Sequence, residues 1–428
     1  MGLLGCGNVG GALLPLLEQQ RASIAARTGI DLQVAKVAVR SLSKSRDVEV
    51  PEALLTSDAA AVVGDPGIDL IVELIGGIEP ARELILAALR AGKPVVTGNK
   101  ELLANHGAEL YAVAAENEVD LLFEAAVAGG IPIMRPLRES LVGEPITRVL
   151  GIVNGTTNFI LSRMSDAGAS YADALSEAQT LGYAERDPTA DVEGFDAGAK
   201  AAIIATIAFG ASVVAGDVYH EGISKVTSAD IAFAARLGYV IKLLGIAELV
   251  DDGNADHKAP EVAVRVHPVM VDQNHPLASV RDSFNAVFIE GAAVGDLMLY
   301  GRGAGGPPTA SAVLGDVIDA ASNLTRSTYA AIGDLPRARI QPIDNVRSAF
   351  YLSLNVADAT GVLAKVADVF GRHGVSIQSM EQEGLGDEAR LVFITHEAVE
   401  SNLQSTLRDL QQLDVVHSVG GMMRVIGS

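Results

Sequence analysis

The chain has 428 residues, enough for roughly two or three domains. Its formal net charge of −21 argues against nucleic acid as a partner, because phosphate contacts need Lys and Arg surfaces. Cys6 is the single cysteine, so an intramolecular disulfide is excluded and a reducing, cytoplasmic location is expected. Apolar residues make up 49% of the chain and aromatic residues only 4%, which favours helices packed on buried parallel strands.

The first third of the chain alternates short apolar strands with amphipathic helices. We expect strands at 3–4, 32–39, 68–74, 94–97 and 119–124, and helices from the first Gly loop to residue 17, at 80–91 and at 101–117. This alternation predicts an α/β fold with a doubly wound, Rossmann-type parallel sheet. The domain is placed at residues 1–130, completed by about 303–335. Its first strand has at most four residues before Gly5, which suggests a longer natural N-terminus or a truncation.

From about residue 130 the pattern predicts an α+β domain over 131–302, for substrate binding and dimerisation. Helices are expected at 172–182, 197–210 and 229–237, and a strand at 261–266. The uncharged run 201–216 is too short and too rich in Gly and Ala to span a bilayer easily, so it is interpreted as a buried helix ending near Gly210, and no membrane partner is expected. A loop rich in Gly and Pro then opens a helix at 309–322.

The sequence pattern of residues 345–428 predicts a separate C-terminal module. Its strands and helices follow the order βαββαβ, which is typical of a ferredoxin-like two-layer sandwich. The expected strands are 349–357, 375–380, 390–396 and 415–425, and the expected helices are 361–373 and 400–411.

A dinucleotide-binding pattern lies between the first strand and the first helix. Glycines at positions 5, 7 and 10 let the backbone approach a pyrophosphate, and the helix N-terminus offers N–H donors. The expected cofactor contacts are Gly5, Gly7, Asn8, Val9 and Gly10. The alternative is a tight Gly turn without a ligand.

The second strand ends without the acid that binds the ribose of NAD. Arg40 stands at its tip instead, and an arginine there can accept the 2′-phosphate of NADP. We therefore expect NADP to be preferred, with NAD possible. The alternative for Arg40 is an ordinary exposed loop charge.

The segment 182–200 combines five carboxylates with Lys200 and leads into a strongly apolar helix. Asp196 and Lys200 are four residues apart, so they share one helix face and can pair. A paired, half-buried lysine is a plausible proton-transfer group. The alternative is a helix N-terminus that carries acids because the macrodipole favours them.

Taken together, the ordered motifs resemble those of homoserine dehydrogenase, in its single-function form with a C-terminal ACT domain. The resemblance covers essentially the whole chain. It rests on the Gly5–Gly10 loop and on segments 73–77, 97–100, 123–132, 151–158, 182–200, 303–305 and 309–310.

This resemblance implies an NAD(P)-dependent interconversion of L-homoserine and L-aspartate 4-semialdehyde, on the route to threonine and methionine. It assigns proton transfer to Lys200, with Lys100 as the other candidate for proton transfer or for polarising the carbonyl. The remaining implied roles are substrate binding by Asp196, Glu185 and Asp191, and cofactor contacts by Lys100, Gly182 and Gly305.

The family also implies a monovalent cation, Na⁺ or K⁺, held by Glu124 with the backbone carbonyls of Val127, Gly129 and Ile131. The alternative is that Glu124 only caps a strand-to-helix turn. In the C-terminal module, the turn from Asp358 to Gly361 resembles the ACT turn, whose usual ligand in this family is threonine, a feedback inhibitor. Here the alternative is a dimerisation domain that binds nothing.

Three other enzyme classes and one non-enzyme fit the sequence less well. A sugar or inositol dehydrogenase is disfavoured because 99–101 reads Asn-Lys-Glu in place of Glu-Lys-Pro and because that family lacks the C-terminal module. Aspartate-semialdehyde dehydrogenase needs a nucleophilic cysteine, and Cys6 belongs to the Gly loop. No zinc-ligand cluster is recognisable among the scattered His. A non-catalytic amino-acid sensor would not need Lys100, Glu185, Asp196 and Lys200 together for hydride chemistry. We expect a homodimer or homotetramer.

Overall fold

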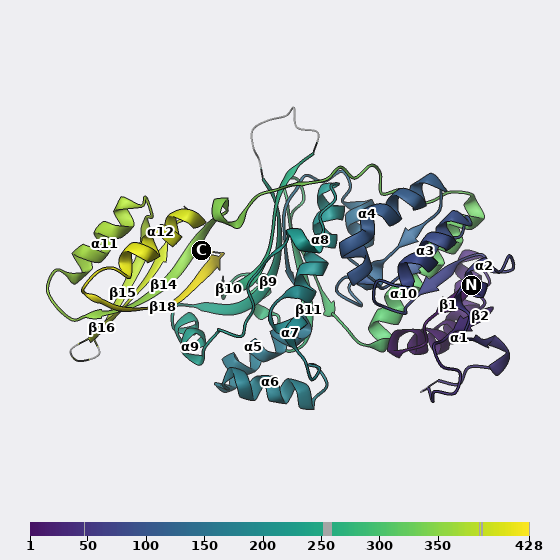
Figure 1. Cartoon of the computed structure of the whole chain (residues 1–428), viewed down its shortest axis with the longest axis horizontal. Helices are drawn as coiled ribbons and strands as arrows, with labels where there is room; N and C mark the ends of the chain where they lie inside the picture. Colours follow the sequence, from purple (N-terminus) through teal and green to yellow (C-terminus); the bar gives the residue numbers. More distant parts are fainter. Residues whose placement is uncertain (47, 251–258, 385, 387, 428) are drawn as a thin grey trace.

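Three units follow one another along the molecule, as Figure 1 shows: a parallel α/β domain, a central antiparallel sheet with helices, and a C-terminal two-layer domain. The structure is a computed structural model that describes residues 1–46, 48–250, 259–384, 386 and 388–427. The expected α/β class, with a Rossmann-type sheet and a ferredoxin-like C-terminal module, is confirmed.

The N-terminal sheet is parallel throughout and has the strand order β3-β2-β1-β4-β5-β6, the order of dinucleotide-binding folds. Along β1, Leu3 packs into the core under α1 and α10, while Leu4 packs into the core under α3 and α4, so helices cover both faces. The elements are β1 (Gly2–Leu4), α1 (Asn8–Thr28), β2 (Lys36–Ala38), β3 (Leu55–Thr56), α2 (Ala59–Gly64), β4 (Ile71–Glu73), α3 (Ala81–Arg90), β5 (Val95–Thr97), α4 (Lys100–Glu116), β6 (Leu121–Leu122) and α10 (Gly306–Arg326).

The boundaries of several of these elements differ from the predictions. The first helix continues past residue 17 to Thr28, because Ile24, seven residues after Leu17, stays on the buried face. Strands β2, β4, β5 and β6 are shorter than expected, whereas β1 begins one residue earlier than expected. Ile68 and Leu70 are buried but lie before β4, although the Leu70 carbonyl still accepts from Gly2 N of β1 at 2.9 Å.

The central sheet has the order β12-β11-β7-β9-β10 and is antiparallel within this part. Helix α8 packs against β9 and β10, and it ends at Phe209 with Gly210 in the left-handed conformation, as expected. The elements are β7 (Ile146–Ile152), α5 (Gly155–Ala167), α6 (Tyr171–Thr180), α7 (Thr189–Val192), α8 (Phe195–Phe209), β8 (Tyr219–His220), α9 (Ser228–Arg236), β9 (Tyr239–Val250), β10 (Glu261–Asp272), β11 (Phe284–Gly291), β12 (Gly295–Arg302) and β13 (Arg339–Ile340).

The C-terminal domain has the predicted βαββαβ order, with a short additional strand, β17. Strand β18 pairs antiparallel with β14 and, at its end, parallel with β10 of the central sheet, so one sheet runs through both units. The elements are β14 (Arg347–Ala357), α11 (Val362–Arg372), β15 (Ile377–Gly384), β16 (Glu388–Thr395), β17 (Ala398–Val399), α12 (Glu400–Leu410) and β18 (Val416–Ile426).

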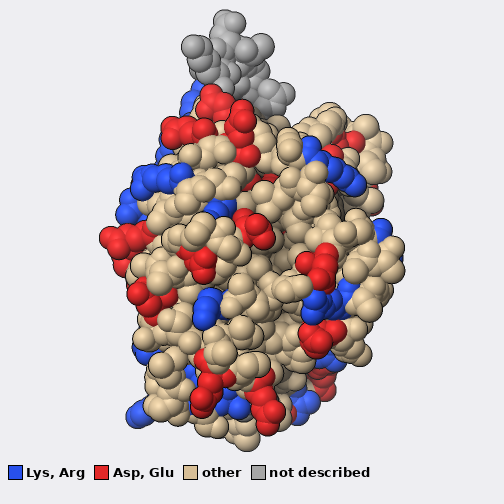
Figure 2. Space-filling view, turned by 90° about the vertical axis from the view of Figure 1, so that its right-hand side faces the viewer, with Lys and Arg blue, Asp and Glu red and all other residues tan. Residues whose placement is uncertain are grey.

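The surface carries charges of both signs. On the face seen in Figure 2, Lys and Arg side chains are interspersed with Asp and Glu. None of the helices in the described ranges combines the length and apolarity that crossing a membrane requires.

Candidate active site

The Gly-rich turn lies where the strand order reverses, between β1 and β4. Gly5 has a φ of +98°, and a Cβ there would lie 2.6 Å from the Leu74 carbonyl oxygen. A Cβ on Gly10 would overlap the Gly5 carbonyl, whereas one on Gly7 would meet nothing within 4 Å. The backbone is therefore tight on the protein side and open on the other side, as a pyrophosphate cradle needs.

The second Gly loop returns to the first. A Cβ on Gly306 would lie 2.8 Å from the Asn8 carbonyl oxygen, so the start of α10 packs against the start of α1. Gly305, which caps α10, has a φ of +116° that disfavours other residues. The structure thus brings Gly305 next to the Gly5–Gly10 turn, as the sequence led us to expect.

Arg40 lies exposed after β2, a position that fits both a contact with the cofactor and an ordinary loop charge. A second arginine, Arg46, was not predicted. Its guanidinium donates to the carbonyls of Ser41 and Lys44, and its positive charge partly offsets the burial that raises the pKa of Cys6 in the Gly loop. Arg46 therefore orders the loop beside the Gly turn, a role with no local sequence signal.

A buried ionic cluster forms where α4 meets α8. Lys200 donates to Asp196 Oδ2 and to the Val153 carbonyl, both at 2.7 Å. Lys100, the first residue of α4, forms an ion pair with Asp196 Oδ1. A cation at a helix N-terminus is disfavoured by the macrodipole, so Asp196 compensates for the position of Lys100. The structure brings these three predicted residues together.

The protonation of the cluster follows from burial and charge. Burial lowers the pKa of Lys200, against the raising effect of Asp196. Burial raises the pKa of Asp196, but the charges of Lys200 and Lys100 outweigh it and hold that pKa below its ordinary value. Asp196 is therefore an anion that orients a lysine able to lose its proton more easily than usual.

Asn154 is a site residue that sequence reasoning missed. It caps α5, accepting from Thr157 N at 2.9 Å, and its amide donates to Asp191 at 2.7 Å and to Asp196 at 2.9 Å. Burial raises the pKa of Asp191, against the lowering effect of this hydrogen bond. Asn154 thus holds two carboxylates at the same site, and the available signal was its place in the 151–158 motif.

Other predicted residues of this segment lie outside the buried cluster. Glu185 and Gly182 are exposed on the loop between α6 and α7. This loop is anchored by Thr156, which donates to the Tyr183 carbonyl at 2.6 Å, and by the contact between the Tyr183 and Phe159 rings, 4.9 Å apart. The loop therefore borders the site without contributing to its core.

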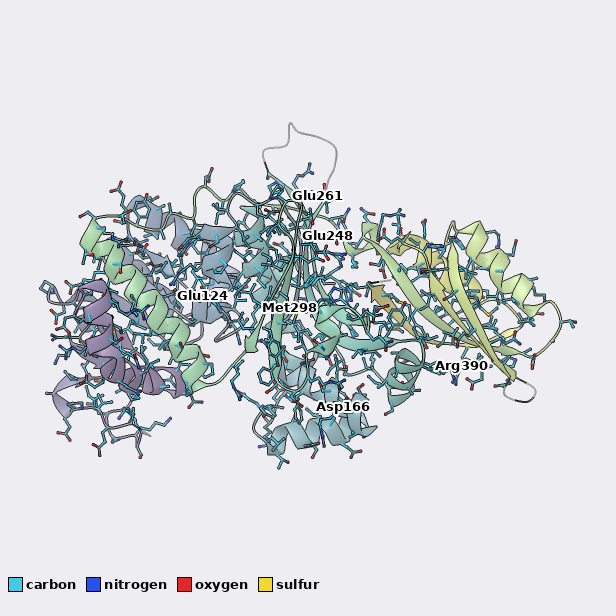
Figure 3. All side chains as sticks on the ribbon, turned by 180° about the vertical axis from the view of Figure 1, so that it is seen from behind. Glu124, Asp166, Glu248, Glu261, Met298 and Arg390 are labelled. Carbon is cyan, nitrogen blue, oxygen red and sulfur yellow. The ribbon has the colours of Figure 1, made fainter. Side chains whose placement is uncertain are left out.

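The Glu124 carboxylate meets the backbone just before the helical turn η3 (Pro136–Ser140). The residue begins the 3₁₀ turn η2 (Glu124–Ala126), at the junction of the first two units seen in Figure 3. Its carboxylate accepts from the backbone N–H groups of Ile133, Met134 and Arg135 at 2.5, 2.7 and 2.9 Å. The carboxylate therefore caps the backbone at residues 133–135, and cation binding by Glu124 stays a prediction.

The backbone after Glu124 still forms a turn of carbonyls. Ala128 and Gly129 have φ values of +53° and +55°, and a Cβ on Gly129 would overlap the Gly303 carbonyl. The carbonyls of Val127, Gly129 and Ile131 stand along this turn, and such oxygens suit a hard cation.

In the C-terminal domain, Gly361 caps α11 with a φ of +86°, and both it and Asp358 are exposed. Asp358 Oδ2 lies 3.6 Å from the place of a Cβ on Gly384, so the turn faces β15. The helix start is accessible to a ligand.

A Gly-rich turn at the strand-order reversal of a parallel sheet, and a Lys–Asp–Lys cluster with Asp196 and Lys200 buried where α4 meets α8, define a nicotinamide-dependent dehydrogenase. Comparison with known families agrees: the homoserine dehydrogenase NAD-binding domain matches residues 5–124, homoserine dehydrogenase matches 132–318 and the ACT domain matches 350–415. The chain belongs to the homoserine dehydrogenases, NAD(P)-dependent oxidoreductases, with a C-terminal ACT domain.

Similar proteins span the whole chain. Homoserine dehydrogenase of Corynebacterium glutamicum is 50% identical, covering 99% of this chain and 94% of the relative. The enzyme of Mycobacterium tuberculosis is 48% identical, covering 100% and 97%. The crystal structure of the Thiobacillus denitrificans enzyme has a TM-score of 0.90 at 42% identity, covering 99% and 97%. A hyperthermophilic archaeal homoserine dehydrogenase in complex with NADPH has a TM-score of 0.61 at 30% identity, covering 74% of this chain and 96% of that one.

Proposed function

We propose that Lys200 transfers the proton when the hydroxyl of L-homoserine and the aldehyde of L-aspartate 4-semialdehyde interconvert. The observation that carries this proposal is the burial of Lys200 with Asp196 as its ion-pair partner. A bound nicotinamide would supply the acceptor for the hydride that leaves the alcohol carbon. The hydroxyl proton passes to the Lys200 amine at the same stage, the C=O bond forms, and the reverse reaction returns the proton from the ammonium.

Lys100 has a distinct part. It is half-exposed and forms an ion pair with Asp196, so it can polarise the reacting oxygen beside this pair. Asp191 and Glu185 offer carboxylates to the substrate ammonium, and Asn154 keeps Asp191 turned toward Asp196. An amino-acid substrate needs this combination of a cationic and an anionic side.

We further propose NADP as the preferred cofactor, with Arg40 at its 2′-phosphate and Lys100 and Gly182 beside the nicotinamide end. The absence of an acid at the tip of β2 supports this preference. Arg40→Ala should weaken NADP use and leave NAD use unchanged. An unchanged ratio of kcat/KM for the two cofactors would remove Arg40 from the argument.

For the cation, we propose that Na⁺ or K⁺ is held by Glu124 together with the backbone carbonyls of Val127, Gly129 and Ile131. The Glu124 Oε2 atom accepts from only one of the three N–H groups that meet this carboxylate, so it keeps a lone pair for a cation. Activity should rise with added KCl or NaCl and not with tetramethylammonium chloride. Activity that responds equally to all three salts would leave only an ionic-strength effect.

In the ACT domain, we propose that threonine binds at the turn from Asp358 to Gly361 and inhibits the enzyme, and that the enzyme works as a homodimer or homotetramer. The accessible N-terminus of α11 suits an amino-acid carboxylate. Asp358→Asn should relieve inhibition by threonine, while light scattering reports the subunit count.

The test of the whole proposal is NADPH formation from L-homoserine by the purified protein. We expect homoserine-dependent turnover, a loss of about a hundredfold or more in Lys200→Ala, and inhibition by threonine in the wild type. Full turnover by Lys200→Ala would refute the role of that lysine. Absence of homoserine turnover despite binding of NADP would favour the sensor alternative.

A further inference from the structure

A polar cavity of about 350 Å³ lies between the central sheet and the C-terminal domain, away from the Lys–Asp–Lys cluster. Its volume is in the range of small-ligand pockets. The central sheet and the C-terminal domain both contribute basic side chains to its lining, namely Arg148, Arg265, His267, Arg347, His396 and Arg424.

Two buried side chains in this cavity carry polar atoms without a hydrogen-bond partner in the described chain. Arg265 is 4% exposed, and its Nη2 donates to Glu248 at 2.8 Å, but its Nε and Nη1 have no partner within the described chain. His267 is 1% exposed, and its Nε2 likewise has none among those residues. Buried polar groups are nearly always paired in folded proteins, so these atoms are the ones that a ligand would satisfy.

The two unpaired groups need opposite kinds of partner. The Arg265 nitrogens are donors, suited to a carboxylate. His267 Nδ1 lies 3.0 Å from the Pro268 carbonyl, which can only accept, so the hydrogen sits on Nδ1 and Nε2 presents a lone pair. Burial and the charges of Arg424 and Arg265 hold the pKa of His267 well below its ordinary value, which keeps this ring neutral.

Strand register places both groups on one wall. Arg265 and His267 are two apart on β10, so they share a face of the sheet, and Arg265 stands opposite Ile246 of β9. Glu248, labelled on the central sheet in Figure 3, extends the same face. Val264 and Val266 alternate with them and pack into the core that also contains residues of α8.

The remaining charges around the cavity are largely balanced. Arg148 is held by both oxygens of Glu290, and Arg424 is held by Glu400 and Glu221. Arg347 is exposed at the rim, where it donates to the Glu397 carbonyl at 3.2 Å, and Glu397 and His396 are also exposed there. Arg265 and Arg347 are therefore the cations best placed to take an added carboxylate.

We propose that this cavity binds a small carboxylic acid that also carries a hydroxyl group. The carboxylate would accept from Arg265, assisted at the rim by Arg347, and the hydroxyl would donate to His267 Nε2. The Glu397 carboxylate at the rim can also pair with an ammonium on the same ligand. Hydroxy acids and hydroxy amino acids therefore share the required carboxylate and hydroxyl groups. This site is separate from the turn at Asp358 and does not depend on the proposed catalytic roles.

The position of the cavity links it to the catalytic helix. Tyr219 and His220 of β8 pair with Arg265 and Val266 of β10. The His220 ring lies against Gly198, where a Cβ would overlap its Nε2. Gly198 stands on α8 between Asp196 and Lys200, so a ligand on β10 contacts the layer that supports the catalytic cluster.

Calorimetric titration of the full-length protein, without substrate or cofactor, tests the proposal with two matched pairs of probes. L-malate and succinate differ by one hydroxyl, as do L-threonine and L-2-aminobutyrate. We expect the hydroxylated member of at least one pair to bind about tenfold more tightly, because its hydroxyl meets an otherwise unpaired acceptor. The first pair reports a hydroxy acid and the second a hydroxy amino acid.

Variants identify the site. His267→Phe should abolish the difference within the responding pair, and Arg265→Lys and the exposed Arg347→Gln should weaken binding of both members. Arg326→Gln, at the exposed end of α10, is the control and should bind as the wild type does. Equal binding within both pairs, or wild-type binding by the His267 and Arg265 variants, would overturn the proposal. Failure of the wild type to bind any of the four probes would also overturn the proposal. If Arg347→Gln oligomers then dissociate, a second copy of the chain closes the cavity in place of a ligand.

Discussion

The ion pair between Asp196 and Lys200 should set the pH range in which the enzyme works. Asp196 Oδ2 lies 2.7 Å from Lys200 Nζ, and both groups are largely shielded from water. A unit charge at that distance is worth about 1.5 kcal/mol even at the dielectric constant of water. That energy changes the equilibrium between ammonium and free amine about tenfold. Asp196→Asn removes the charge while keeping the shape of the side chain.

Without that carboxylate, Lys200 loses its proton at lower pH. The base form needed for homoserine oxidation then persists at lower pH, so the acidic limb of the kcat profile should move down by about one pH unit. The alkaline limb of semialdehyde reduction should move in the same direction, because that reaction needs the ammonium. The plateau should also fall, since Lys200 is less well oriented.

The assay follows NADPH absorbance in both directions from neutral to strongly alkaline pH. Asp187→Asn is the matched control, because Asp187 is an exposed acid of the same segment that accepts from Thr189. Its profiles should keep the wild-type limbs. If the limbs of Asp196→Asn also stay where they are in the wild type, Lys200 is not the titrating group and the reasoning fails.

Three further changes test other parts of the structure. Asn154→Ala should raise KM for homoserine about tenfold in initial-rate assays and lower the unfolding free energy by about 1 kcal/mol through the lost N-cap; an unchanged KM would confine Asn154 to capping. Gly10→Ala should weaken NADP binding more than tenfold in fluorescence titrations, because the Cβ meets the Gly5 carbonyl, and retained affinity would contradict the tight turn. Burial lowers the pKa of Lys242 to about 8 from 10.5, so between these values the unfolded chain binds more protons and the unfolding free energy rises with pH. The unfolding free energy of Lys242→Met, measured with urea, should not show this rise with pH. An equal pH dependence in the wild type and the variant would refute the assignment to Lys242.

The N-terminal α/β domain could be predicted because its sequence signals are local. The Gly turn lies within ten residues, and the alternation of strands and helices is visible in sequence. Element boundaries were less accurate, since apolar residues such as Leu70 are buried beside a strand as well as within it. The pair of Asp196 and Lys200 was predictable for the same reason, because four residues on one helix fix their relation.

Contacts between distant segments were not predictable in this way. Asn154 contacts Asp191 and Asp196, which lie 37 and 42 residues away in the sequence. Locally, its contact with Thr157 N indicates only an N-cap. The sequence allowed Glu124 either to hold a cation or to cap a turn. Its contacts with the backbone N–H groups of residues 133–135 depend on the fold of the chain. In both cases the polar side chain is satisfied by groups that the fold, and not the local pattern, brings near.

The join between the central sheet and the C-terminal domain is the largest feature of this kind. Three residues of β18, ending at Ile426, pair in parallel with β10, and Arg424 is buried between Glu400 of its own domain and Glu221 of the central unit. Separating the domains would break this ladder and expose or unpair a buried guanidinium, which is costly. We therefore expect the C-terminal domain to act on the enzyme without detaching, through small shifts of β10 that reach α8 by way of β8.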